Sequence, residues 1–377
     1  MTDTHNHELS GLFVVSLEQA VAAPYVASRL ADAGARVVKV ERPGGDFARY
    51  YDGDVKGLSS YFVWLNRGKE SIVLDLKQPK DLELFKKMLK KADVFIQNLM
   101  PGALDRIGIS LAKLREEDPK LITCDISGYG TSGPHSHMKA YDFLVQAEVG
   151  LAEISGGKEE PGRVGVSICD IAAGMTAHSA ILQALIGRHL TGEGRAIEVS
   201  LFHALADWMN VPYLQHKYGG RTIGRPGLNH PTIAPYGAYE CRGGQTILIS
   251  IQNEREWRRL CRDVMDQSYL LDNPKFGSNV NRVKNRVELD KIINSVFGQY
   301  NLEELIKKLE NTQIAYGRLN GMEEFIEHPQ NRFVDVKTPK GEIKLLSPGP
   351  LFDGSLPKLS GVPEVGQHTE LIRSEFS

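Results

Sequence analysis

The sequence has few cysteine and tryptophan residues, four and three among 377, and no two cysteines stand in CxxC spacing. The cysteines are Cys124, Cys169, Cys241 and Cys261. They lie in apolar or mixed segments, which predicts reduced thiols in a cytoplasmic protein rather than disulfides. The pair His135 and His137 has no cysteine or carboxylate beside it, as a metal site would require. No metal site is therefore predicted.

An excess of charge of one sign is also missing. Lys and Arg number 45 against 47 Asp and Glu, which gives a formal net charge of −2. Nothing in this balance attracts the whole chain to nucleic acid or to an anionic membrane. The first ten residues lack the apolar core of a signal peptide, and no apolar run reaches membrane-spanning length. We expect a cytoplasmic protein without nucleic-acid or membrane partners.

Two motifs that identify particular enzyme classes are absent. No GxGxxG follows the first predicted strand, so a nicotinamide dinucleotide site is not inferred. The nearest approach to the GxSxG of serine hydrolases is Gly165–Cys169, where cysteine replaces the second glycine. Ser167 is therefore interpreted as a strand residue.

What the sequence does contain is a regular alternation of short apolar runs with amphipathic segments. Predicted strands cover Leu12–Leu17, Ala35–Glu41, Ser71–Leu76, Asp93–Gln97, Leu121–Ile126 and Gly194–Ser200. Predicted helices cover Ala22–Asp32, Pro79–Lys91, Ser110–Asp118, Ile171–Leu190 and Leu201–Asn210. This order is typical of an α/β fold with a parallel sheet.

A second, smaller unit is expected after a crossing rich in glycine and proline. The crossing lies between Lys217 and Gly237, and short strands and helices of α+β type follow it. We predict a large domain of residues 10–212 plus 335–377 and a small domain of residues 213–334.

Polar residues recur where the predicted strands end. These residues are Arg42, Lys77, Asn98, Arg106 and Lys139. Each alone is explained by a surface salt bridge or a helix cap. In a parallel sheet, however, the carboxyl ends of the strands share one edge, which is where extended ligands bind.

Asp170 stands at the start of the longest apolar segment. An aspartate in that place commonly caps a helix by accepting backbone N–H groups. It can also act as a nucleophile, because a carboxylate attacks activated carbonyls such as thioesters. The helix terminus is expected to keep Asp170 ionised and to offer N–H donors to the oxyanion. Cys169 is the alternative nucleophile, since a helix terminus also lowers a thiol pKa.

Several motifs, in order, resemble those of the family III CoA-transferases, which include formyl-CoA transferases and 2-methylacyl-CoA racemases. The resemblance runs from Leu12 to about Phe352. Its motifs are Leu30–Asp46, Asn66–Ile72, Leu74–Lys77, Ala92–Asn98, Pro101–Arg106, Ser127–Gly130, Ala140–Asp142, Gly165–Asp170 and Gly174–Met175.

The resemblance implies roles for individual residues. It assigns Asp170 as the catalytic nucleophile and Asp142 as an auxiliary acid. Where the racemases have a histidine, this chain has Tyr141, which argues against racemisation. The positions expected to bind coenzyme A are Val21, Arg42, Leu74, Lys77, Asn98, Leu99, Arg106, Lys139 and Tyr141.

The resemblance also implies a Rossmann-like large domain and an interlocked homodimer. Formyl-CoA transferases have glutamine where this chain has Val21, and their mobile glycine loop is replaced by Gly224–Pro231, which argues against oxalate as the acceptor. Other segments are more similar to mesaconyl-CoA transferases. The implied substrates are an acyl-CoA and a short, branched dicarboxylic acid. The alternatives are an acyl-CoA racemase or isomerase using Asp170 as a base, and a non-catalytic CoA-binding protein.

Overall fold

The computed structural model describes residues 7–222 and 224–377, which form two units with separate hydrophobic cores. The large unit comprises Met1–Leu151, Arg163–Tyr213 and Arg332–Ser377. The small unit comprises Ala152–Gly162 and Leu214–Asn331.

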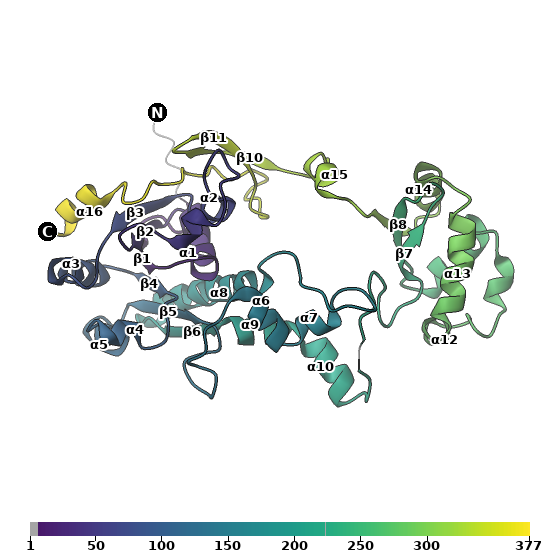
Figure 1. Ribbon diagram of the computed structural model, residues 1–377, viewed down its shortest axis with the longest axis horizontal. Helices are drawn as coiled ribbons and strands as arrows, with labels where there is room; N and C mark the ends of the chain where they lie inside the picture. Colours follow the sequence, from purple (N-terminus) through teal and green to yellow (C-terminus); the bar gives the residue numbers. More distant parts are fainter. Residues whose placement is uncertain (1–6, 223) are drawn as a thin grey trace. The chain divides into compact units, whose positions relative to one another are not determined.

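The large unit is built on a six-stranded sheet in the order β3-β2-β1-β4-β5-β6 (Figure 1). The strands are β1 (Phe13–Leu17), β2 (Arg36–Glu41), β3 (Lys69–Val73), β4 (Val94–Gln97), β5 (Ile122–Ser127) and β6 (Ala196–Ser200). All neighbouring pairs are parallel; Val14, for example, pairs with Val37 on one side and Val94 on the other. The predicted parallel α/β sheet is confirmed, and its order is that of doubly wound dinucleotide-binding folds.

Helices cover both faces of this sheet. They are α1 (Ala22–Asp32), α2 (Ser60–Leu65), α3 (Pro79–Leu89), α4 (Ala103–Arg106), α5 (Leu111–Glu117), α6 (Asp142–Glu148), α8 (Ile168–Thr191) and α9 (Leu201–Trp208), with the short 3-10 helix η1 (Phe47–Tyr50). On one face α1, α8 and α9 pack on Val14, Ile96 and Cys124. On the other face α3 and α4 pack on Val15, Phe95 and their neighbours. Because both faces are covered, the strands read as continuous apolar runs.

The strand β3 begins at Lys69, two residues before the predicted start. Lys69 pairs with Val37 of β2, and its side chain is almost fully buried. A lysine normally marks a surface position, so the sequence pattern placed the boundary after it. The lysine is tolerated here because its ammonium group bonds to Glu18 and Asn66.

The helix α8 differs from the prediction in two respects. It begins at Ile168 rather than Ile171, and it leaves Met175, Ile186 and Leu190 at least half exposed, so it is not buried on all sides within the chain. Its 24 residues are also long and apolar enough to cross a membrane by length and composition, which corrects the expectation that no run reaches that length. Its other face belongs to the core of the large unit.

The small unit has a three-stranded antiparallel sheet in the order β7-β8-β9. Its elements are β7 (Tyr236–Glu240), β8 (Thr246–Ser250), α11 (Glu254–Arg259), the π-helix η2 (Leu260–Val264), η3 (Ser268–Leu271), α12 (Asn279–Lys284), α13 (Arg286–Phe297), α14 (Leu302–Asn311), β9 (Ala315–Arg318) and α15 (Met322–Ile326). The helices α7 (Leu151–Ile154) and α10 (Asn210–Lys217) span the points where the chain passes between units. The core is formed by Trp257, Phe276, Ile293, Leu305 and their neighbours.

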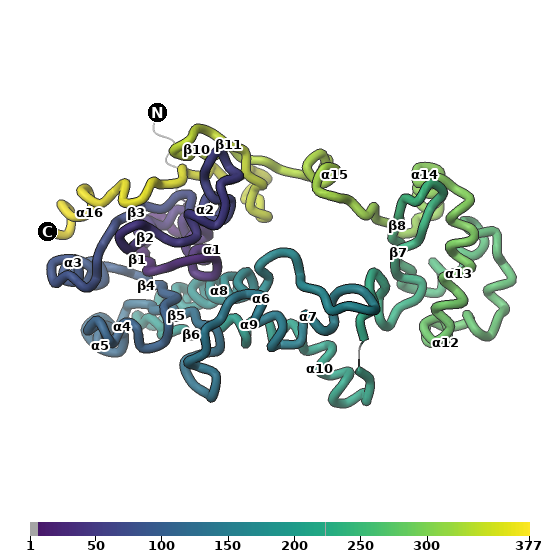
Figure 2. The backbone as a smooth tube through the Cα atoms, viewed as in Figure 1, coloured from purple at the N-terminus to yellow at the C-terminus, as the bar shows by residue number. Residues whose placement is uncertain are grey.

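The C-terminal segment returns to the large unit. It contains the hairpin β10 (Phe333–Thr338) and β11 (Gly341–Leu346) and the helix α16 (Thr369–Phe376), which lies beside β3 and α3 (Figure 2). His368 and Thr369 accept hydrogen bonds from the backbone of β3 at Ser71 and Val73. The segment therefore covers the edge strand of the sheet.

Candidate functional site

The first turn of α8 carries Asp170, but Asp170 is not its cap. The N-cap residue is Ser167, and no side-chain hydrogen bond from it to the helix is found among the described residues. Instead Asp142 Oδ1 accepts the backbone N–H of Cys169 at 2.7 Å and that of Asp170 at 3.3 Å. The capping role expected of Asp170 thus belongs to Asp142, which is distant in sequence and therefore had no local signal.

Asp142 is itself held in place. It is the first residue of α6, it is buried, and its Oδ2 accepts a hydrogen bond of 2.7 Å from Nε2 of Gln146. The Gln146 Oε1 accepts the backbone N–H of Val164 at 3.0 Å. The pair therefore fixes the chain that leads into α8 as well as the helix terminus.

The electrostatic state of Asp170 also differs from the expectation. Burial and the neighbouring carboxylate of Asp142 raise the pKa of Asp170 from 3.8 to about 7. The helix terminus does not keep it ionised, because Asp142 already occupies the N–H groups that would stabilise its charge. A carboxylate with this pKa is a stronger base and nucleophile than an exposed one.

The backbone donors of this turn have partners within the chain. Ile168 donates to Val166 O at 2.8 Å and Ile171 donates to Ser167 O at 2.9 Å, while Cys169 and Asp170 donate to Asp142. The expectation that these groups would bind an oxyanion is not supported, because none of the four is free. Oxyanion donors would have to come from another segment.

Cys169 is a poor alternative nucleophile. Its side chain is fully buried, and burial together with Asp142 raises the pKa of its thiol well above the usual range. The thiolate form required for attack is therefore disfavoured near neutral pH.

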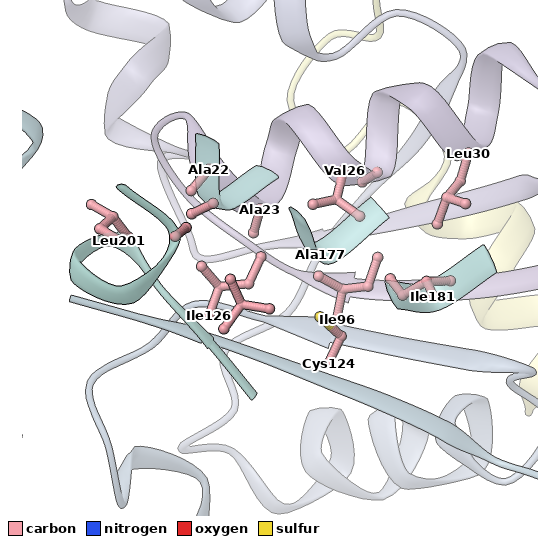
Figure 3. Close-up of a cluster of buried hydrophobic side chains, with 14 of the residues drawn as sticks. Ala22, Ala23, Val26, Leu30, Ile96, Cys124, Ile126, Ala177, Ile181 and Leu201 are labelled. Carbon is pink, nitrogen blue, oxygen red and sulfur yellow. The ribbon is translucent and has the colours of Figure 1, made fainter. Parts of the chain in front are cut away.

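The N-terminal part of α8, which carries Asp170, packs on the start of α1. Gly174, one turn further along α8, packs so closely on α1 that a Cβ there would lie 3.0 Å from Ala22 O and 2.9 Å from Cδ1 of Tyr25. Residues four apart share one face of a helix, so Asp170 lies beside the turn that precedes Ala22. Figure 3 shows the continuation of this contact, where Ala177 and Ile181 of α8 lie opposite Val26 and Leu30 of α1.

The turn Glu18–Val21 connects β1 to α1 and is pinned on one side by Asn98. Asn98 Oδ1 accepts the Gln19 N–H at 2.9 Å, and its Nδ2 donates to Gln19 O at 2.8 Å. Ala20 in this turn has φ of 63°, which is strained for a residue with a Cβ. The structure thus brings Asn98 and Val21 to one turn, although the side chain of Val21 is buried.

The remaining residues expected to bind coenzyme A follow β2, β3, β4 and β5, and therefore leave the same edge of the sheet. Those with exposed side chains are Arg42, Lys77, Arg106, Lys139 and Tyr141. Leu74 is only 2% exposed, so it offers mainly backbone atoms, and the N–H of Leu99 is bonded to Gln97. Positively charged side chains in the segments that follow these strands would suit a phosphate-bearing ligand.

Sequence reasoning missed an aromatic cluster beside Asp170. Tyr51 contacts Phe47 and Tyr61, with ring centroids 5.6 and 5.5 Å apart. Burial and the charges of Asp46 and Asp170 raise the pKa of Tyr51 to about 12, so its hydroxyl stays protonated near these acids. Its members come from η1, from the residue that follows η1 and from α2, and these short elements have no periodic pattern that would bring them together in the sequence.

A cavity of about 370 Å³ lies within the small unit. Its lining includes Lys158, Arg221, Arg225, Arg286 and Asp290, but none of the residues that the sequence assigned to the site. The candidate site is therefore defined by the hydrogen bonds around Asp170 rather than by this cavity.

Comparisons with known proteins agree with the sequence motifs. The model of "CoA-transferase family III" matches residues 9–369. The chain is 33% identical to succinyl-CoA:glutarate CoA-transferase of Homo sapiens, over 97% of this chain and 85% of the relative. It is 31% identical to succinyl-CoA:mesaconate CoA-transferase of Haloarcula hispanica, over 97% and 99%. A crystal structure of a CAIB/BAIF family protein from Brucella suis, 32% identical, superposes with a TM-score of 0.85 over 99% and 100% of the two chains.

Proposed function

Because the chain belongs to CoA-transferase family III, we propose that it moves CoA from a short dicarboxylic acyl-CoA to a free dicarboxylic acid through a covalent intermediate on Asp170. The observation that supports the proposal most is the position of Asp170, a carboxyl with a pKa of about 7 at the start of the long helix α8. That the protein is a CoA-transferase follows from its family and from the activities named for its relatives.

The proposed reaction has four steps. Asp170 attacks the thioester carbonyl, the C–S bond breaks, and a mixed anhydride forms as CoA thiolate leaves. The thiolate attacks the aspartyl carbonyl, which releases the donor acid and leaves an Asp170–CoA thioester. The acceptor carboxylate attacks this thioester, its C–S bond breaks, and a second anhydride forms as CoA thiolate leaves. The thiolate then attacks the acyl carbonyl of this anhydride and expels the carboxylate of Asp170. The product is the new acyl-CoA with Asp170 regenerated.

The names of the relatives support the proposed substrate class. Proteins that share about a third of this sequence are named for succinyl-CoA with glutarate or mesaconate, and succinate, glutarate and mesaconate are all dicarboxylates. The exposed cations Arg42, Lys77, Arg106 and Lys139 are proposed to bind the phosphates of CoA. We further propose a cytoplasmic homodimer as the working form.

The test of the nucleophile is chemical trapping. The enzyme is incubated with succinyl-CoA, treated with hydroxylamine, and digested, and the modified peptide is mapped by mass spectrometry. We expect a hydroxamate on Asp170, its loss in Asp170→Asn, and its retention in Glu116→Gln, which changes an exposed acid of α5. Transfer activity retained in Asp170→Ala would refute the proposed intermediate.

The acceptor is identified by a screen. Glutarate, mesaconate, oxalate and the monocarboxylate butyrate are offered with succinyl-CoA, and the new thioesters are measured. We expect transfer to the longer dicarboxylates. Incorporation of solvent deuterium at the α-carbon of an acyl-CoA without any acceptor would favour the racemase alternative instead.

A further inference from the structure

Four charged side chains are completely withdrawn from solvent behind the β1–α1 turn. Glu18, Lys39, Asp46 and Lys69 each have a side-chain exposure of 0%. Lys39 Nζ lies 2.9 Å from Asp46 Oδ2 and 3.3 Å from Glu18 Oε1, and Lys69 Nζ also bonds to Glu18. We call these four residues the buried charge network; it contains two cations and two anions.

Such a network is not explained by stability alone. Removing charges from water is costly, and a well-packed apolar replacement is often as stable as a buried ion pair. Buried charges of this kind can instead fix one backbone arrangement. The backbone groups that bond to these charges therefore show which segment the network fixes.

The network holds the strained β1–α1 turn. Asp46 Oδ1 accepts the N–H of Ala20 at 3.3 Å, and Lys39 Nζ donates to the backbone oxygen of Glu18 at 3.5 Å. Ala20 has φ of 63°, a conformation that needs support from its surroundings. Asn98 completes the support from the opposite side.

Asp46 also ends the turn that carries Arg42. Its N–H donates to Glu41 Oε2 at 2.8 Å, and its Oδ1 accepts the N–H of Ala48 at 3.0 Å. Glu41 is fixed by Arg49, whose Nη2 lies 2.6 Å from its Oε1. Asp46 therefore joins the Arg42 turn, at the end of β2, to the turn beside Asp170.

We propose that Asp46, held by Lys39, is a positioning residue of the CoA-transfer site. It keeps the turn Glu18–Val21 and the turn Arg42–Asp46 in one fixed arrangement, so that the thioester and the phosphates of CoA are placed together. This proposal rests on the proposed function for its kinetic consequence, but the turn arrangement can be measured without turnover.

The test is a double-mutant cycle between Asp46→Ala and Ala20→Gly in the full chain. Asp46→Ala should lower kcat/KM for acyl-CoA about tenfold to a hundredfold, because small misplacements at a reacting centre have effects of that size. Ala20→Gly in the same background should restore about fivefold, because glycine adopts positive φ without support. A purely structural ion pair would not be rescued by a glycine at position 20.

The matched control is Asp32→Ala, which removes the partly buried ion pairs of Asp32 with Arg67 and Arg29 at the other end of α1; neither partner belongs to the two turns. It should lower Tm as Asp46→Ala does while leaving kcat/KM within about twofold. Asp46→Asn, which retains Oδ1 as an acceptor, should fold and show an intermediate loss. Equal kinetic losses in Asp46→Ala and Asp32→Ala, or no rescue by Ala20→Gly, would overturn the proposal.

Amide hydrogen exchange separates the two proposals. Asp46→Ala should increase exchange in a peptide covering residues 17–24, and Asp32→Ala should not. If the wild type shows no CoA transfer but the exchange pattern is as expected, the proposed function fails and the positioning role of Asp46 stands. Unchanged exchange in Asp46→Ala, with wild-type transfer intact, would refute the positioning role alone.

Discussion

Two aspartates share one helix terminus, and the structure gives them different tasks. Asp142 occupies backbone N–H groups of α8, while Asp170 remains beside it with a raised pKa. The division follows from geometry, because Asp142 takes the N–H groups of the turn and leaves Asp170 buried beside a second carboxylate, which raises the pKa of Asp170. Asp170 therefore remains the proposed nucleophile of the two.

The raised pKa predicts the pH dependence of the first chemical step. Attack requires the carboxylate form of Asp170, so the rate of Asp170 acylation should rise with pH and level off above about 7. Asp142→Asn removes the nearby negative charge, so the midpoint should move to lower pH. Single-turnover trapping at pH values from 5 to 9 measures this midpoint. The control is Glu116→Gln, which should leave the midpoint unchanged. If Asp142→Asn also leaves it unchanged, Asp142 does not raise the pKa of Asp170.

The same shift predicts that losing the nucleophile stabilises the fold. The pKa of Asp170 is higher in the folded chain, about 7, than the reference 3.8, so ionisation opposes folding and stability falls as pH rises between these values. Asp170→Asn should therefore raise the free energy of unfolding by on the order of 2 kcal/mol at pH 8 and by less at pH 5. Thermal melts at both pH values test this, and a gain that is equal at both would contradict it.

At the residue scale, the sequence identified Asp170 but not its surroundings. The pattern of α8 placed an acid at the helix start, whereas the capping by Asp142 and the charge network depend on contacts between distant segments. One local signal was available, because Lys39 interrupts a valine-rich strand and a buried lysine requires acidic partners. Its partner Asp46 was not deducible, since loops carry no periodicity.

At the element scale, the close approach of α8 to the first turn of α1 requires a glycine at position 174. Gly174 has no space for a Cβ against Ala22 and Tyr25, whereas Gly187 of the same helix has no atom within 4 Å of that position. Gly174→Ala should lower stability by about 1 to 3 kcal/mol and reduce transfer, because the helix that carries Asp170 must shift.

The control for this prediction is Gly187→Ala. It should stabilise α8 by about 0.5 to 1 kcal/mol, because alanine is the better helix former. Tm and kcat are measured for both variants. Equal effects of the two substitutions would show that helix propensity, rather than the contact with α1, determines the outcome.

The central strands of the sheet were predictable because burial on both faces leaves short apolar runs, as in β1 and β4. The helix α1 was predicted with its observed bounds, Ala22–Asp32. The strands β9 and β10 were missed: Ala315–Arg318 is only four residues long and has no buried residue, and Phe333–Thr338 buries only Val334 and Val336. In the small unit α11 passes into a π-helix, and Asn285 separates α12 from α13.

At the scale of the whole molecule, the proposed homodimer predicts the mass of the protein in solution. The solution mass should be twice 41.8 kDa, measured by light scattering after size-exclusion chromatography. The exposed apolar residues Met175, Ile186 and Leu190 of α8, together with Trp208 and Tyr213, are consistent with further contacts. A mass of 41.8 kDa at micromolar concentration, with full transfer activity, would refute the dimer as the working form.

The burial of all four cysteines has a practical consequence for spectroscopy. Maleimide dyes should react slowly with the native chain, because its thiols are shielded and burial raises their pKa. A cysteine introduced at an exposed position of each unit, such as Lys113 and Arg255, can therefore be labelled against a low background. Energy transfer between the two dyes would then report how far apart the units stand during each stage of the catalytic cycle.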